Sequence, residues 1–217
     1  MAESKQITVL VLVTLLIGAT ALLLLPKGPI IFEGDLVVDN YEVTFHSNGT
    51  LSEKYTYDVK SSGQYRMLFR YWDDILSFEK LGRSYIEFVS IKYPSGTTGY
   101  AKDYKGDVRL FGNESHRYTI DSLAYTNEVG AYNPSYFNKG KYEIEYNYIL
   151  HPPIQYDSEV SHLNLKLQRE HIPIKNFKIM IPKENILKVY PHPPNLKVSE
   201  YQNYIIITGT SPKNELL

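Results

Sequence analysis

The segment Tyr41–Val59 reads YEVTFHSNGTLSEKYTYDV, and it decides the fold class. Apolar and polar residues alternate on both sides of the triplet at 47–49, which is the pattern of two half-buried strands joined by a turn. A two-residue turn would place the apolar residues of the two strands on opposite faces of the hairpin. A three-residue turn pairs Phe45 with Leu51 and brings the apolar residues onto one face. We therefore predict the three-residue turn, with Gly49 in the left-handed conformation of a bulge.

The same period-two pattern returns along the rest of the chain, between turn signals such as YPSG, NKGK and PHPPN. Besides the hairpin, the segments predicted as strands are Ser84–Ile91, Lys141–Leu150, His162–Leu167, Asn176–Ile181 and Tyr204–Thr208. The 20 tyrosines fall largely in stretches that also carry valine, isoleucine, threonine or phenylalanine, which is the composition of sheets. The sequence therefore predicts an all-β fold, an antiparallel β-sandwich of immunoglobulin-like or related type.

Two stretches interrupt this pattern. Residues 94–116 are rich in glycine and polar residues, and they predict a loop with one short strand around Val108–Phe111. Residues 123–140 carry Tyr125, Tyr132, Tyr136 and Phe137 among asparagine, glycine and proline. This composition predicts an aromatic loop, which could bind a partner or could simply cover the open end of the sandwich core.

The composition excludes several classes of protein. A net charge of −1 gives no basic face for nucleic acid. The chain has no cysteine, so disulfides, thiolate metal sites and cysteine nucleophiles are excluded. The six histidines show no metal-binding spacing, and no phosphate-binding loop or nucleophile elbow is present. We therefore expect neither a cofactor, nor a metal, nor an enzyme.

The N-terminal region predicts a membrane segment. Residues Ile7–Leu25 form an uncharged apolar run of 19 residues, long enough as a helix to cover about 28 Å. Ala19 and Ala21 could form the cleavage site of a signal peptide, but the leucines that follow favour an uncleaved anchor. We expect a tail at 1–6, the transmembrane helix at 7–25, a linker at 26–34 and the β-sandwich at 35–217.

The location of the β domain is predicted from weaker signals. The single lysines on either side of the apolar run lean slightly towards a cytoplasmic N-terminus. Asn48 and Asn113 each begin an Asn-x-Ser/Thr triplet and are candidate glycosylation acceptors. These features favour a single-pass protein of the cell membrane with its β domain on the extracytoplasmic side.

Residues 64–76, QYRMLFRYWDDIL, most resemble a reactive site, because they contain the chain's only tryptophan beside two arginines and two aspartates. Asp73 and Asp74 could be an acid pair, but adjacent carboxylates on a strand point to opposite faces. We expect a strand from Gln64 to about Arg70, then a short turn or helical segment that holds Trp72 against the core. Arg70, Asp73 and Asp74 are then expected to form a structural ion pair or cap.

Several of these segments together resemble a known family. YEVTFHSNGTLSEKYTYDV, LFR, YIEFVSIKYPSG, HRYTI, KYEIEYNYIL and HIPIKNFKIMIP occur in the order and spacing of the domain of unknown function 2207 proteins, the YciQ-like group of predicted membrane proteins. The resemblance covers about residues 36–210 and is to the extracytoplasmic N-terminal domain. It places Arg70 at the family's "YR" position. It implies a membrane-anchored β-sandwich without an established activity.

The leading expectation for function is a non-enzymatic interaction or structural module, such as a subunit of a membrane or cell-surface assembly, with a protein partner. One alternative is a carbohydrate-binding or glycan-processing ectodomain, in which the aromatic loop stacks on sugar and Asp73 or Asp74 act as acids. A second alternative is a component of a surface polymer that donates or accepts a strand.

Overall fold

The computed structural model describes residues 34–152, 154–156, 159–168, 172–184, 186–194 and 196–213. The chain separates into two units, Met1–Ile31 and Phe32–Leu217, and every described residue belongs to the second. The predicted tail, the predicted membrane segment and all but the last residue of the predicted linker lie outside the described residues. Within the described part of the chain, no helix is both long enough and apolar enough to cross a bilayer.

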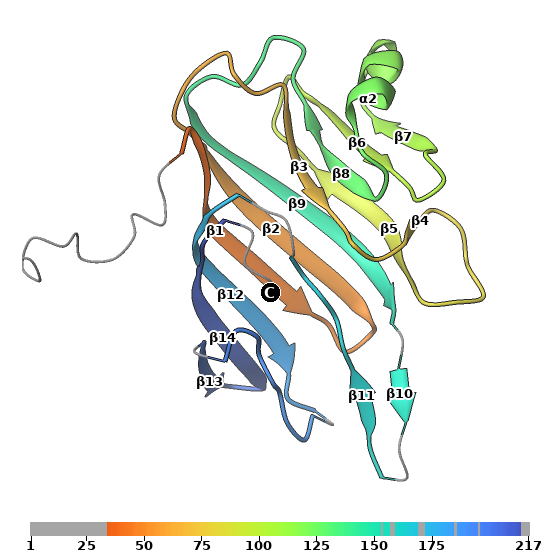
Figure 1. Ribbon diagram of the computed structural model, residues 1–217, viewed down its shortest axis with the longest axis vertical. Coiled ribbons are helices and arrows are strands. Elements are labelled where there is room, and N and C mark those ends of the chain that lie inside the picture. Colours follow the sequence, from red (N-terminus) through yellow and green to blue (C-terminus); the bar gives the residue numbers. More distant parts are fainter. Residues whose placement is uncertain are drawn as a thin grey trace, which may run out of the picture. The chain divides into compact units, whose positions relative to one another are not determined.

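Most of the described residues form a large sheet of eight strands (Figure 1). From one edge to the other, its strands are β13 (Lys197–Tyr201), β14 (Tyr204–Ser211), β12 (Ile174–Pro182), β1 (Leu36–Phe45), β2 (Thr50–Val59), β9 (Gly140–His151), β5 (Tyr85–Lys92) and β4 (Leu76–Ser77). The predicted strands of the first hairpin and four of the five further predicted strands lie in this sheet.

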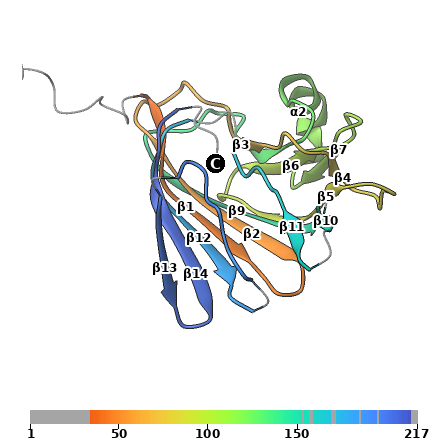
Figure 2. The ribbon, with the colours of Figure 1, turned by 60° about the horizontal axis from the view of Figure 1, so that its bottom comes forward.

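A smaller sheet of four strands faces part of the large one (Figures 1 and 2). Its order is β3 (Met67–Tyr71), β8 (Glu128–Tyr132), β6 (Thr98–Lys102) and β7 (Val108–Phe111). A short 3-10 helix, η1 (Glu114–His116), leads into α2 (Arg117–Leu123), whose Ile120 packs with Tyr100 and Tyr132 on one face of this sheet. A separate pair, β10 (Ile154–Tyr156) and β11 (Ser161–Leu163), completes the strands.

The arrangement is mostly β and sandwich-like, with one main core between the two sheets. The large sheet contributes an inner face of tyrosines, including Tyr41, Tyr146 and Tyr148, which are fully buried. The small sheet contributes Leu68 and Val129, and the same core holds Trp72. The small sheet lies against the β9 and β5 side of the large sheet, while β1, β12, β14 and β13 extend beyond it (Figures 1 and 2).

The hairpin prediction is confirmed. Phe45 pairs with Leu51 and Tyr41 pairs with Tyr55, which is the register of the three-residue turn. The amide of His46 donates to the carbonyl of Thr50 at 2.9 Å and closes the turn. Gly49 has a φ of 82°, the left-handed conformation that the turn requires.

The prediction of a purely antiparallel sandwich is wrong at two strand pairs. β1 pairs with β12 in parallel, and the short β4 pairs with β5 in parallel. Apolar alternation has the same period in both kinds of sheet, so it could not reveal strand direction. The 128 residues between the end of β1 at Phe45 and the start of β12 at Ile174 form β2 to β11 and their connections. The direction in which β12 returns depends on that path.

Five strands were missed, among them the short β4 and β10, and one was overestimated. The predicted loops at 94–116 and 123–140 contain β6 and β8, whose sequences TGYAK and EVGAY have glycines that resemble turn residues. Both glycines serve close packing instead, because a Cβ at Gly99 or Gly130 would lie 2.5–2.6 Å from a neighbouring atom. β13 was also missed. Of the predicted strand His162–Leu167, only the first two residues are in β11.

Replacing Gly49 by alanine should lower the free energy of unfolding by about 1 kcal/mol, because a residue with a Cβ is strained in the left-handed region. No atom lies within 4 Å of the added Cβ, so the effect isolates backbone strain. Gly82 is the matched control, since it also has open space around it but no positive φ. Chemical denaturation of both variants measures the difference, and equal stability of Gly49→Ala and Gly82→Ala would contradict the argument.

Candidate functional site

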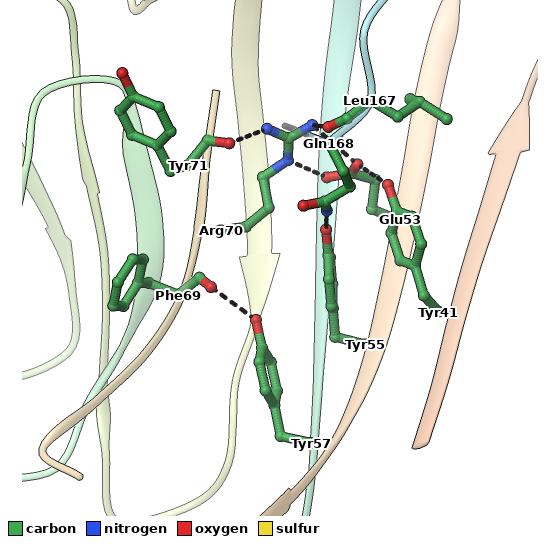
Figure 3. A network of polar contacts seen from close by, with 9 residues as sticks. All are labelled: Tyr41, Glu53, Tyr55, Tyr57, Phe69, Arg70, Tyr71, Leu167 and Gln168. Atoms are coloured by element: carbon green, nitrogen blue, oxygen red, sulfur yellow. Dashed lines mark hydrogen bonds and ion pairs between the residues drawn. The ribbon is translucent and has the colours of Figure 1, made fainter. Parts of the chain in front are cut away.

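A buried ion pair joins the two sheets. Glu53 lies on the inward face of β2, and its side chain is fully buried. Arg70 of β3 donates from Nε to Glu53 Oε2 at 3.0 Å and from Nη2 to Glu53 Oε1 at 3.3 Å. The two side chains point toward each other across the core (Figure 3). An uncompensated charge would be costly at this depth, so each partner stabilises the other in its charged form.

Further polar groups complete the bonding of this pair. The Tyr41 hydroxyl donates to Glu53 Oε1 at 2.5 Å. The guanidinium of Arg70 also donates to two backbone carbonyls, that of Leu167 at 2.5 Å and that of Tyr71. Burial is the largest single influence on the pKa of Arg70 and acts to lower it, but the Glu53 carboxylate and the surrounding tyrosines together outweigh burial and raise this pKa. Burial and the Glu53 carboxylate both raise the pKa of Tyr41, so this hydroxyl stays protonated.

Trp72 covers the guanidinium. The Cζ atom of Arg70 lies 3.1 Å from the centroid of the Trp72 ring, within the range of a cation–π contact. The indole also meets the ring of Tyr148 edge to face, with centroids 5.4 Å apart. The chain's only tryptophan therefore reports on the centre of the core.

A cavity of about 630 Å³ lies beside this network. All five residues of β3 line it, and so do Leu36, Val38, Tyr55, Tyr57 and Ile174 of the large sheet. β3 is the edge of the small sheet, whereas the large sheet continues to β1 and β12 beyond it. The cavity occupies the space that this mismatch leaves, and its volume is typical of ligand pockets.

Several polar side chains that line the cavity are already hydrogen-bonded to the protein. The Tyr57 hydroxyl donates to the carbonyl of Phe69 at 2.9 Å, and Gln168 donates to the Tyr55 hydroxyl (Figure 3). Arg70 is neutralised by Glu53. Of the described residues that line the cavity, only Arg70 and Lys213 are charged, and Lys213 is exposed. The cavity therefore offers an apolar surface with one exposed cation.

A second buried carboxylate lies on the other face of the small sheet. Glu128 is 1% exposed, and it accepts from the Tyr100 hydroxyl at 2.5 Å and from the amide of Tyr125 at 3.2 Å. Burial raises the pKa of Glu128 to about 7, against the lowering effect of these two hydrogen bonds and of the Lys102 charge. Gly130 leaves the space in which the Tyr100 hydroxyl reaches this carboxylate.

The predicted strand at residues 64–70 is observed as β3, and Trp72 is fully buried as predicted. A bend rather than a helical turn follows, and Asp73 and Asp74 are exposed there. The carboxylate that pairs with Arg70 by hydrogen bonds is Glu53 and not one of these aspartates. Burial and the neighbouring Asp73 raise the pKa of Asp74. Neither aspartate lines the large cavity.

The four aromatic residues predicted as one loop do not form one surface. Tyr132 is in β8 and is 2% exposed, and Phe137 is fully buried in the main core. Tyr125 and Tyr136 are exposed by 66% and 39%. Of the four, only Tyr125 lines the cavity, whereas Phe137 packs in the main core and Tyr132 packs with Ile120 in the smaller cluster.

The two candidate glycosylation sites lie in exposed turns. Asn48 accepts from the amide of Thr50 at 3.1 Å, and Asn113 accepts from the amide of Ser115 at 3.0 Å. Across the described residues, no group of three or more histidine, aspartate or glutamate side chains is placed to hold a metal ion.

Sequence reasoning missed Glu53, Tyr55, Tyr57 and Gln168. The available signal was the alternation of β2, in which Leu51, Tyr55 and Tyr57 face inward and Glu53 shares their face. A charged residue at an inward position implies a buried partner of opposite charge. Only the tertiary structure shows that this partner is Arg70.

A family described as "Predicted membrane protein (DUF2207) N-terminal domain" has a sequence pattern that matches residues 37–217. The chain belongs to this family. The resemblance seen in the sequence is thereby confirmed. In the DUF2207 chain, the matched region includes both sheets, the buried ion pair and the cavity.

No curated protein sequence is significantly similar to the DUF2207 chain. Similar solved structures include the M1 zinc metallopeptidase from Deinococcus radiodurans, with 10% identity and a TM-score of 0.37. A mutant of that enzyme bound to a Tyr-Ser-Ala substrate gives 9% identity and a TM-score of 0.38. Each match covers 81% of this chain and 39% of the metallopeptidase chain. At these TM-scores the likeness supports no conclusion about activity.

Replacing Arg70 by methionine should lower the free energy of unfolding by about 3–5 kcal/mol, because it leaves the Glu53 carboxylate buried without its counter-charge. Glu53→Leu should destabilise similarly by leaving Arg70 unpaired. The double variant Arg70→Met with Glu53→Leu should recover most of the loss, since neither charge remains. Chemical denaturation of the four proteins completes a double-mutant cycle. Additive losses in the double variant would show that the pair is not coupled.

Glu128 should make stability depend on pH. Its folded pKa of about 7 lies above the ordinary value of 4.5, so the folded state binds the proton more tightly than the unfolded state does. Its stabilising contribution is complete below pH 4.5 and is lost as the pH rises through 7. Between these limits the loss should approach about 3 kcal/mol.

Glu128→Gln should lack this loss. The difference in unfolding free energy between the variant and the parent protein should therefore shift in favour of the variant by about 3 kcal/mol from low to neutral and higher pH. Denaturation curves at a series of pH values measure it, and a difference that stays constant over the series would contradict the raised pKa.

Proposed function

We propose that this protein is a non-enzymatic binding module, anchored in a membrane by residues 7–25, with its β domain on the extracytoplasmic side. The family description as a predicted membrane protein supports the membrane location. The uncharged run at 7–25 has the length of a single span. The two Asn-x-Ser/Thr triplets in exposed turns are compatible with an outward-facing domain of immunoglobulin-like or related type.

The cavity between the sheets is the observation that carries the binding role. It has about 630 Å³ of space, and aromatic and aliphatic side chains form most of its wall. A well-packed core leaves few voids larger than a water molecule. A cavity of this size forgoes packing energy that smaller spacing between the sheets would supply, which is expected where a ligand or a partner segment completes the core.

Binding is favoured over catalysis because the buried charged groups near the cavity are already paired within the protein. Arg70 and Glu53 neutralise each other, and the hydroxyls of Tyr55 and Tyr57 each have a hydrogen-bond partner. A general acid or base needs a proton position that a substrate can reach. The groups in this network use their protons to hold the two sheets together.

The two alternative functions find less support. The glycan hypothesis needs acidic residues and aromatic rings around one cleft, but Asp73 and Asp74 are outside the cavity lining and Tyr132 is buried. The strand-exchange hypothesis needs an unprotected sheet edge. β13 forms one edge of the large sheet, and its exposed Lys197 and Glu200 are the kind of charged side chains that discourage edge pairing.

The proposed role can be tested with an apolar fluorescent dye, N-phenylnaphthylamine, and the full chain held in an amphipathic polymer without detergent. Dye in the cavity should accept energy from Trp72, which contacts the cavity residue Arg70. Phe69→Asp should weaken saturable binding by about tenfold or more, because it places a charge on the apolar wall.

The matched control is Tyr118→Asp, which makes the same kind of change at an exposed residue of α2 outside the cavity. It should leave dye binding unchanged. Absence of saturable energy transfer in the parent protein, or equal weakening by the two variants, would refute the cavity as the binding site.

A further inference from the structure

We infer that the cavity binds a long-chain fatty acid, with the alkyl chain between the sheets and the carboxylate at Lys213. This inference rests on the proposed function and names the ligand class of the same site. Three features favour this ligand: the chemistry of the cavity wall, the charge at the rim of the cavity, and the blocked edge of β3.

The wall selects an apolar body. Leu36, Val38 and Ile174 contribute aliphatic surface, and Phe69 contributes an aromatic ring. Of the polar groups that line the cavity, those of Tyr55, Tyr57 and Gln168 are bonded to other protein groups, and the hydroxyls of Tyr65, Tyr71, Tyr125 and Thr126 are the other neutral ones. A sugar or nucleotide would have to desolvate many hydrogen-bonding groups in exchange for these few hydroxyls, whereas an alkyl chain has no such groups to lose.

The charge selects an anionic end. No acidic residue is among the described residues that line the cavity, and the charge of Arg70 is cancelled by Glu53. The Lys213 ammonium makes no ion pair with any described residue. Its exposure lets it meet a carboxylate at the boundary with water. Charge complementarity thus favours an amphipathic anion over a neutral apolar molecule.

An extended peptide fits this site less well, although β3 is a sheet edge. A peptide that adds to an edge needs free backbone acceptors on that strand. The carbonyl of Phe69 already accepts from Tyr57, and the carbonyl of Tyr71 already accepts from Arg70. An added strand would have to break bonds of the network that joins the sheets, while an alkyl chain leaves them intact.

The test compares cis-parinaric acid, a fluorescent fatty acid, with its neutral methyl ester on the full chain in amphipathic polymer. Energy transfer from Trp72 reports occupancy of the cavity. The acid should bind more tightly than the ester. Lys213→Glu should weaken binding of the acid by about threefold or more and leave binding of the ester unchanged, since an exposed charge pair is replaced by repulsion. The control Lys197→Glu, on β13 and outside the cavity, should change neither.

Displacement of parinarate by saturated fatty acids tests the alkyl part. Affinity should increase by about fourfold for each added methylene until the cavity is filled. Phe69→Asp should weaken binding of fatty acids of every chain length.

Equal binding of the acid and the ester, both unaffected by Lys213→Glu, would overturn the inference that the ligand is a fatty acid. An affinity that does not depend on chain length would overturn it too. Stronger displacement by a diacyl phospholipid or an apolar peptide would overturn it as well. In each of these cases saturable dye binding that Phe69→Asp weakens would leave the proposed binding function standing. Loss of dye binding too would remove both.

Discussion

The buried pair of Arg70 and Glu53 is the interaction on which the rest of the structure depends. The two residues come from different sheets, and burying either charge without the other would cost a large amount of folding free energy. The pair therefore fixes the distance and register between β3 and β2. Trp72 stacks on the guanidinium and Tyr41 donates to the carboxylate, so the aromatic core is arranged around the two charges. Leu167 joins through its carbonyl, which ties the segment after β11 to the same point.

The cavity follows from the way the sheets are joined. The ion pair holds β3 over β2, while the large sheet continues to β1 and β12, where the described residues of the small sheet provide no further strand. The resulting cavity adjoins the polar network, whose two charges neutralise each other. A site of this kind can accept an apolar ligand without disturbing the bonds that hold the domain together. Tyr125 connects it to Glu128, since its amide bonds that carboxylate and its side chain lines the cavity.

Much of the large sheet could be predicted because its strands alternate clearly and carry β-branched and aromatic residues. The register of the first hairpin followed from one requirement, that Phe45 and Leu51 share a face. The small sheet was harder. Gly99 and Gly130 look like turn residues in the sequence, but they are where neighbouring rings and backbone approach most closely. The partner of Arg70 was assigned to nearby aspartates because sequence proximity is a poor guide to contacts across a core.

The sequence by itself determined the β class, the first hairpin, the burial of Trp72 and the membership of the DUF2207 family, since these depend on local alternation, turn chemistry and ordered motifs. Tertiary structure alone decided that β1 and β12 run parallel, that Arg70 meets Glu53, and that a cavity remains beside them. The reason is physical. Period-two patterning specifies which face of a strand is buried, but it carries no information on which strand, or which buried charge, will lie opposite.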